Sequence, residues 1–107
     1  MKAETLKGHL DLLLLAAVQS EPAHGYAIAE TLRARSSGAF DLPEGTLYPA
    51  LHRLERSGLL SSRWSEVNRR RRRVYQLTRK GHHALAKQHD EWRDFARAVH
   101  AVVEGPA

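Results

Sequence analysis

The first apolar stretch of the chain has the spacing of a helix. One face carries Leu6, Leu10, Leu13, Leu14 and Ala17, and the other carries Leu12, Leu15 and Val18. A helix that is apolar on nearly every side has to be buried on both faces. We expect it to end at Glu21, because Pro22 disfavours helical geometry in the residue that precedes it.

A second helical pattern runs from about His24 to Arg35. Its one-turn rhythm is carried by Tyr26, Ala29, Leu32 and Arg33. Ser36, Ser37 and Gly38 then close the helix, since clusters of Ser and Gly between periodic segments are typical of loops.

A third helix is predicted after Pro43 and ends at Ser57, ahead of Gly58, a residue type favoured at helix C-termini. Pro49 is tolerated only near a helix start, so the first residue stays open between Glu44 and Leu47. The inner face is apolar and carries Leu47, Leu51 and Leu54. The outer face is polar and basic and carries Gly45, Pro49, His52 and Arg56, flanked by Tyr48 and Arg53.

Two extended segments follow, from Leu59 to Val67 and from Arg69 to Thr78. Asn68, between them, tolerates left-handed backbone geometry, so the pattern predicts a β-hairpin. Thr78 is the predicted cap of a last helix that continues to about Val103. At about 1.5 Å per residue this helix would be roughly 40 Å long. Its apolar stripe consists of Leu85, Trp92, Phe95 or Ala96, Val99 and Val102.

The positive charge is local. The formal net charge of the 107 residues is +5, yet residues 1–60 carry six Lys and Arg against seven Asp and Glu. Residues 61–80 carry eight Lys and Arg against Glu66 alone, and five of the eight are consecutive, Arg69 to Arg73. Such a cluster indicates a polyanionic partner, nucleic acid first and an acidic membrane surface second; the alternative is a solvated charge run.

These elements together predict a mainly α fold with a small β-hairpin, a winged helix-turn-helix. It has three helices, a two-stranded wing and a long C-terminal dimerisation helix. Residues 1–78 are expected to form the DNA-binding domain and residues 79–107 the dimerisation helix, in one compact unit. The dimer is expected because the first helix and the last stripe have too little of their own chain to cover them. The predicted interface residues are Leu10, Leu14, Leu85, Trp92, Phe95, Ala96, Val99 and Val102.

The predicted partner is double-stranded DNA. The third helix fits the major groove, while wing arginines neutralise phosphates or enter the minor groove. Expected contacts on the third helix are Thr46, Tyr48, Pro49, His52, Arg53 and Arg56; the second helix adds Tyr26, and the wing adds Arg69, Arg70, Arg71 and Arg72. Three alternatives stay open: Tyr48 packs at the helix edge, Tyr26 fills the junction between helices two and three, and Thr46 is only a helix cap.

Three segments resemble signatures of PadR-like transcriptional regulators. The run from Gly45 to Leu60 (GTLYPALHRLERSGLL) resembles their recognition helix, His24–Ile28 (HGYAI) their second-helix entry, and Tyr75–Gly81 (YQLTRKG) their exit from the wing. Two departures stand out. The family's wing tips often carry Gly and a mixed basic segment, whereas here Asn68 precedes an unbroken arginine run. Val74 and Tyr75 replace a pair of tyrosines.

The resemblance covers nearly the whole chain and implies a homodimeric repressor of the short branch, with a single C-terminal helix. It implies that the two third helices occupy successive major grooves of a pseudo-palindromic operator. Many members respond to small, often aromatic, effectors. If the dimer axis passes close to Trp92, its two copies are expected to flank a flat pocket for such a ligand. The competing functional class is a winged-helix module that binds protein or RNA without operator specificity, for which the outer face of the third helix would be more apolar.

Several classes are disfavoured by what the sequence lacks. There is no cysteine, which excludes disulfide scaffolds and fits a cytoplasmic location. The apolar run from Leu12 to Val18 is too short to cross a bilayer, so no membrane role is expected. His82, His83 and His89 lack the spacing of zinc helices, so no metal and no other cofactor is expected. Without a cysteine nucleophile, a phosphate loop or a Gly-x-Ser-x-Gly elbow, an enzyme is not expected.

Overall fold

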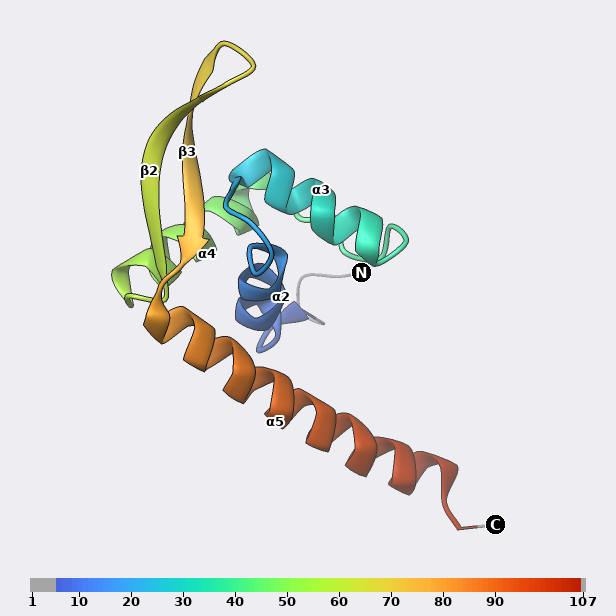
Figure 1. Ribbon diagram of the computed structural model, residues 1–107. Helices are drawn as coiled ribbons and strands as arrows, with labels where there is room; N and C mark the ends of the chain where they lie inside the picture. Colours follow the sequence, from blue (N-terminus) through green and yellow to red (C-terminus); the bar gives the residue numbers. More distant parts are fainter. Residues whose placement is uncertain (1–5, 107) are drawn as a thin grey trace.

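The computed structural model describes residues 6–106. The elements in chain order are α2 (Leu10–Ala17), β1 (Ala23–His24), α3 (Gly25–Arg35), α4 (Glu44–Arg56), β2 (Leu60–Val67), β3 (Arg70–Leu77) and α5 (Arg79–Glu104). Figure 1 shows α2, α3 and α4 gathered into a body, with the β2–β3 ribbon projecting from it and α5 running away from it. The mainly α winged-helix fold is therefore confirmed. Residues 1–5 of the predicted DNA-binding domain and residue 107 of the predicted dimerisation helix lie outside the described range.

The body is held together by leucines from every helix. The largest fully buried side chains are Leu14, Leu15, Ile28, Leu47, Leu51, Leu54, Leu60 and Tyr75. Burying one such side chain contributes about 1.5–3 kcal/mol. Three of these leucines lie at i, i+4 and i+7 along α4, so one face of α4 is fixed against the body and its opposite face remains outside.

Helix α2 is shorter than the apolar pattern predicts. Gly8 has a φ of +89°, and the amide of His9 donates to the carbonyl of Leu6 in a turn, so the helix begins only at Leu10. It ends at Ala17, before the predicted end at Glu21. The expectation was wrong because periodicity registers spacing and is blind to a left-handed glycine that breaks the backbone.

The sheet has a third strand that the sequence did not indicate. β1 pairs antiparallel with β3, with Ala23 opposite Tyr75 and His24 opposite Val74, so the strand order is β1-β3-β2. His24, predicted to begin the second helix, is extended instead and α3 starts at Gly25. A strand of two residues is too short to show alternation, and it forms because β3 offers it an edge.

The turn of the wing has the predicted geometry. Val67 pairs with Arg70, which leaves Asn68 and Arg69 as a two-residue loop. Their φ angles are 52° and 64°, as a type I′ hairpin turn requires at both central positions. Asn tolerates this region well, and its position in the sequence correctly located the tip of the wing.

The junction between the wing and α5 is tightly packed. Thr78 is the N-cap, as predicted, and its Oγ1 accepts from the amide of Gly81 at 3.0 Å while donating to the carbonyl of Gly58. Gly81 is buried, and a Cβ built on it would lie 2.0 Å from the carbonyl oxygen of Leu59. Only glycine fits this approach of α5 to the end of α4.

We therefore expect Gly81→Ala to destabilise the protein, because the added methyl group can only be accommodated by moving backbone. Overpacking of this kind costs about 1–3 kcal/mol. The matched control is Gly45→Ala on α4, where a Cβ meets nothing within 4 Å. Urea unfolding at one protein concentration measures both variants, and equal midpoints for the two would contradict the proposed packing constraint.

Candidate nucleic-acid interface

The outer face of α4 is exposed and mostly polar. Pro49, His52 and Arg56 are exposed, and Thr46 is half-buried. The helix begins at Glu44 with Pro43 as its N-cap residue, so Thr46 lies inside the first turn and is not the cap. The alternative that Thr46 is only a helix cap is therefore wrong.

Arg53 is held by the protein itself. Its guanidinium donates to both carboxylate oxygens of Asp11 on α2, at 2.6 and 3.1 Å. These hydrogen bonds raise the pKa of Arg53. Charge-assisted bidentate pairs fix orientation as well as energy, so this residue joins α4 to the start of α2. The side chain of Arg53 is nevertheless about half exposed.

Tyr48 and Tyr26 lie differently from one another. The ring of Tyr48 covers Gly25 at the start of α3, where an added Cβ would lie 2.5 Å from its Cε1. Tyr48, half-buried, therefore fills the α3–α4 junction while still reaching the surface. Tyr26 is 62% exposed and its ring stacks on His24 with centroids 6.4 Å apart. The alternative that Tyr26 fills the junction is wrong.

The register of the wing gives its two faces different side chains. Cross-strand partners share a face, so Trp64 lies with Arg73, and Glu66 with Arg71. Arg70, opposite Val67, belongs to the other face. The exposed indole of Trp64 carries two guanidinium groups over its ring, that of Arg71 at 5.0 Å and that of Arg73 at 5.4 Å from the centroid. We did not predict a role for Trp64 from the sequence; its signal was an aromatic residue among polar ones on a basic hairpin.

A polar link joins this face of the wing to α4. Ser62 on β2 donates to Oε2 of Glu55 on α4 at 2.5 Å, and Nε of Arg73 donates to Oγ of Ser62 at 2.8 Å. Nη2 of Arg73 lies 3.8 Å from the same carboxylate oxygen. The angle between the wing and α4 is therefore set by side chains as well as by the short connection between them.

A hollow of about 240 Å³ lies between the wing, α4 and the start of α3. Its lining residues are His24, Gly25, Tyr48, Trp64, Arg71, Arg72 and Arg73. Partial burial and the charge of Arg72 lower the pKa of His24, so its imidazole is neutral at pH 7 and the positive charge of the hollow comes from arginine. Phenol, indole and guanidinium groups around one concavity suit an anionic ligand.

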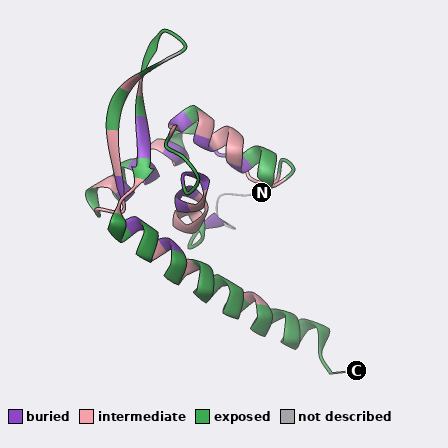
Figure 2. Cartoon of the chain, viewed as in Figure 1, coloured by how far each residue is buried: buried purple, intermediate pink, exposed green. Residues whose placement is uncertain are grey.

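The C-terminal half of α5 carries an exposed apolar stripe. Its members are Trp92, Phe95, Val99, Val102 and Val103. Figure 2 shows this half of the helix exposed along most of its length. Of the other predicted interface residues, Leu10 and Ala96 are half-buried, but Leu14 is 0% and Leu85 6% exposed. Leu14 is sealed in the core of the protomer and has no surface to offer a partner, so we remove it from the interface.

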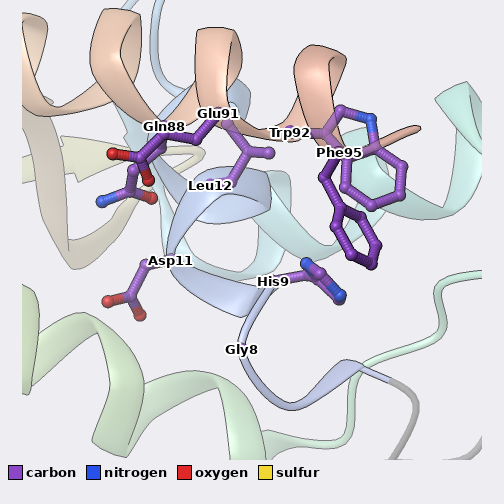
Figure 3. A pocket seen from close by; sticks show the side chains of 8 residues that line it. All are labelled: Gly8, His9, Asp11, Leu12, Gln88, Glu91, Trp92 and Phe95. Atoms are coloured by element: carbon purple, nitrogen blue, oxygen red, sulfur yellow. The ribbon is translucent and has the colours of Figure 1, made fainter. Parts of the chain in front are cut away.

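A second concavity of about 400 Å³ lies where α5 crosses the start of α2. It is lined by Gly8, His9, Asp11, Leu12, Gln88, Glu91, Trp92 and Phe95. Figure 3 shows His9 lying across from Trp92 and Phe95 at one end, while Asp11, Gln88 and Glu91 lie at the other. The His9 and Trp92 rings meet edge to face with centroids 5.1 Å apart. The cavity therefore has an aromatic end and an acidic end.

Residues 6–106 contain neither a metal-binding cluster nor a membrane-spanning helix. No group of three or more His, Asp or Glu side chains in this range is arranged to hold a metal ion. None of the helices in the same range is both long and apolar enough to span a bilayer.

Comparison with known proteins agrees with this architecture. The model of the transcriptional regulator PadR-like family matches residues 14–87. A transcriptional regulator from Mycobacterium tuberculosis is 41% identical over 76 residues, which cover 71% of this chain and 68% of that protein. A PadR family transcription regulator from Clostridium difficile has 34% identity and a TM-score of 0.76, covering 92% of this chain and 100% of its own. One from Eggerthella lenta has 31% identity and a TM-score of 0.82, covering 96% and 88%. The chain belongs to the PadR-like family of transcriptional regulators.

Proposed function

We propose that the protein is a repressor that binds a pseudo-palindromic DNA operator as a homodimer. The observation that carries the proposal is that the outer face of α4 and the arginines of the wing border one hollow, through Tyr48 on one side and Arg71 on the other. A helix presenting His52 and Arg56 beside a basic ribbon suits major-groove reading by the helix and backbone contact by the wing. We assign the chain no catalytic activity.

The proposed dimer uses the stripe on α5. Val99 is 42% and Phe95 58% exposed, although both are apolar. We favour a second protomer as the partner of this stripe. In a two-fold symmetric dimer, the stripe of each protomer covers that of the other, so neither apolar stripe remains exposed. Two α4 helices related in this way would read half-sites about 34–36 Å apart, one turn of B-DNA.

A small aromatic effector is the proposed ligand of the cavity between α2 and α5. Its aromatic end, His9, Trp92 and Phe95, offers edge and face contacts to a planar ring. Asp11 lines the same cavity and also binds Arg53 of α4. A ligand that disturbs Asp11 would therefore change the support of the proposed recognition helix, which gives the effector a physical route to DNA affinity.

The competing class is a winged-helix module that binds protein or RNA. The exposed groups on α4 argue against a protein-docking face, because His52 and Arg56 are polar or charged, whereas the centre of such a face is depleted of charged residues. Binding to an RNA duplex in preference to DNA of the same sequence would favour this alternative.

We expect His52→Ala to change the preferred operator sequence as well as to weaken binding, since a good base contact discriminates by about 1–3 kcal/mol. Selection from a random duplex library, performed on the wild type and the variant, measures this. Arg79→Ala at the start of α5 is a control that removes one exposed positive charge away from α4. If the wild type and both variants select the same consensus sequence, His52 does not read a base and contacts at most the DNA backbone.

We expect Val99→Asp to convert the dimer into a monomer, because a carboxylate would be buried in the apolar seam without a partner. Ala101→Asp is the matched control, since Ala101 is exposed about half a turn away from the stripe. Sedimentation at micromolar concentration reports the oligomeric state of both variants. A monomeric wild type would refute the dimer, and equal behaviour of the two variants would place the interface elsewhere.

We expect 4-nitrophenol, a planar aromatic quencher that does not intercalate into duplex DNA, to quench the fluorescence of Trp92 and to weaken DNA binding. The chain has two tryptophans, so Trp64→Phe leaves Trp92 as the sole reporter. In an Asp11→Asn variant the probe should still bind, while its effect on DNA affinity should shrink, because the neutral amide holds Arg53 less strongly. Fluorescence that is indifferent to the probe would count against the cavity as the effector site.

A further inference from the structure

The arginines of the wing are not equivalent in their surroundings. Arg71 and Arg73 both stack on Trp64, on the face of the ribbon that looks toward α4. Arg73 is committed within the protein, since it donates to Ser62 and pairs with Glu55. The guanidinium of Arg71 lies over the ring of Trp64. Among residues 6–106, it forms no hydrogen bond and no ion pair.

We propose that the hollow between the wing and α4 is a subsite for one phosphodiester of the DNA backbone, with Arg71 as its principal donor and Trp64 as the platform that orients Arg71. Arg73 is then a positioning residue, which with Glu55 and Ser62 holds the wing at a fixed angle to α4. This inference rests on the proposed DNA-binding function and names the group that the wing would grip.

Stacking explains why an indole serves this purpose. An arginine that lies over an aromatic ring uses the face of its guanidinium and keeps the N–H groups at its edge free to donate. Those edge donors match two oxygens of one phosphate. Trp64 is anchored to a paired strand, so Arg71 is held before DNA arrives and loses less freedom on binding than an arginine in open solvent.

The position of the hollow explains what such a contact would achieve. Tyr48 of α4 and Arg71 of the wing line it together, so a phosphate held there touches both DNA-facing elements. Phosphate contacts fix the register of a protein on the duplex, and base contacts then specify the sequence. A phosphate gripped between α4 and the wing would set how deeply α4 enters the groove.

The first test compares Arg71→Ala with Arg70→Ala. Both changes remove one positive charge from neighbouring positions of β3, but Arg70 lies on the opposite face of the ribbon. The probe is a mixed-sequence duplex of about 30 base pairs, long enough for two half-sites. We expect Arg71→Ala to weaken binding about tenfold and to reduce the log–log salt slope by about 0.9 for each phosphate released. Arg70→Ala should have a clearly smaller effect on both quantities.

The second test is a double-mutant cycle between Trp64 and Arg71. Trp64→Leu alone should weaken binding nearly as much as Arg71→Ala, and the double variant should be little worse than either. Arg71→Lys keeps the charge and loses the planar stack, so it should recover only part of the affinity. Losses that multiply in the double variant, or equal losses from Arg70→Ala and Arg71→Ala, would overturn the inference. Failure of the wild type to bind the duplex in low salt would instead overturn the proposed function itself.

The positioning role of Arg73 predicts a change in DNA affinity opposite to the one that charge alone would cause. Glu55→Ala removes a negative charge from a surface that faces DNA, which by charge alone would strengthen binding. We expect it to weaken binding with an unchanged salt slope, because Arg73 and the wing lose their link to α4. Thermal unfolding checks that the variant is folded, and Glu55→Gln, which keeps an acceptor oxygen, should recover part of the loss. Stronger DNA binding by Glu55→Ala would show that the contact between Arg73 and Glu55 does not position the wing for DNA binding.

Discussion

The strand β3 is the constraint on which the arrangement of this protein depends. Its outer end carries the arginine run, whereas Val74 and Tyr75 at its inner end are 8% and 1% exposed. It lies in the middle of the sheet and pairs with β1 on one side and β2 on the other. Burial also raises the pKa of Tyr75, as expected for a phenol set in the core. Five neighbouring positive charges repel one another, so a ribbon that carries them has to be held at its base, and the buried end of β3 supplies that hold.

The basic side chains around this strand divide into those used within the protein and those left free. Arg53 is paired with Asp11, and Arg73 with Ser62 and Glu55, so both stabilise the relation of α4 to its neighbours. Exposed ion pairs contribute at most about 1 kcal/mol each, and their value here lies mainly in orientation. Within residues 6–106, Arg56 and Arg71 form no hydrogen bond or ion pair through their side chains, and a phosphate backbone is the partner that such charges suit best. Counting positive residues alone would have treated all four as equivalent.

Helix α5 separates the proposed reading function from the proposed assembly function. Its first turns are fixed to the wing through Thr78 and Gly81, and its far half carries Val99 and Val102 away from the body. Because the same helix borders the cavity with Trp92, a ligand there would lie next to the proposed seam between protomers. A change in that seam would alter the spacing of two α4 helices without touching either of them. Such a change would couple the proposed effector to the proposed DNA contacts.

The sequence by itself determined the helices, the wing and its tip. The apolar spacing of α4, the left-handed preference of Asn68 and the capping hydroxyl of Thr78 are local features, and local features are readable from neighbours in the chain. Only the tertiary structure decided the rest, because it depends on residues far apart in sequence. β1 exists because β3 offers it an edge. Leu14 is in the core, not at an interface, because it is fully buried within the protomer. Trp64 became a candidate site residue only because the strand register places it beside Arg71 and Arg73. The same register brings Arg73, but not Arg71, into contact with Ser62 and Glu55, and this distinguishes the two arginines.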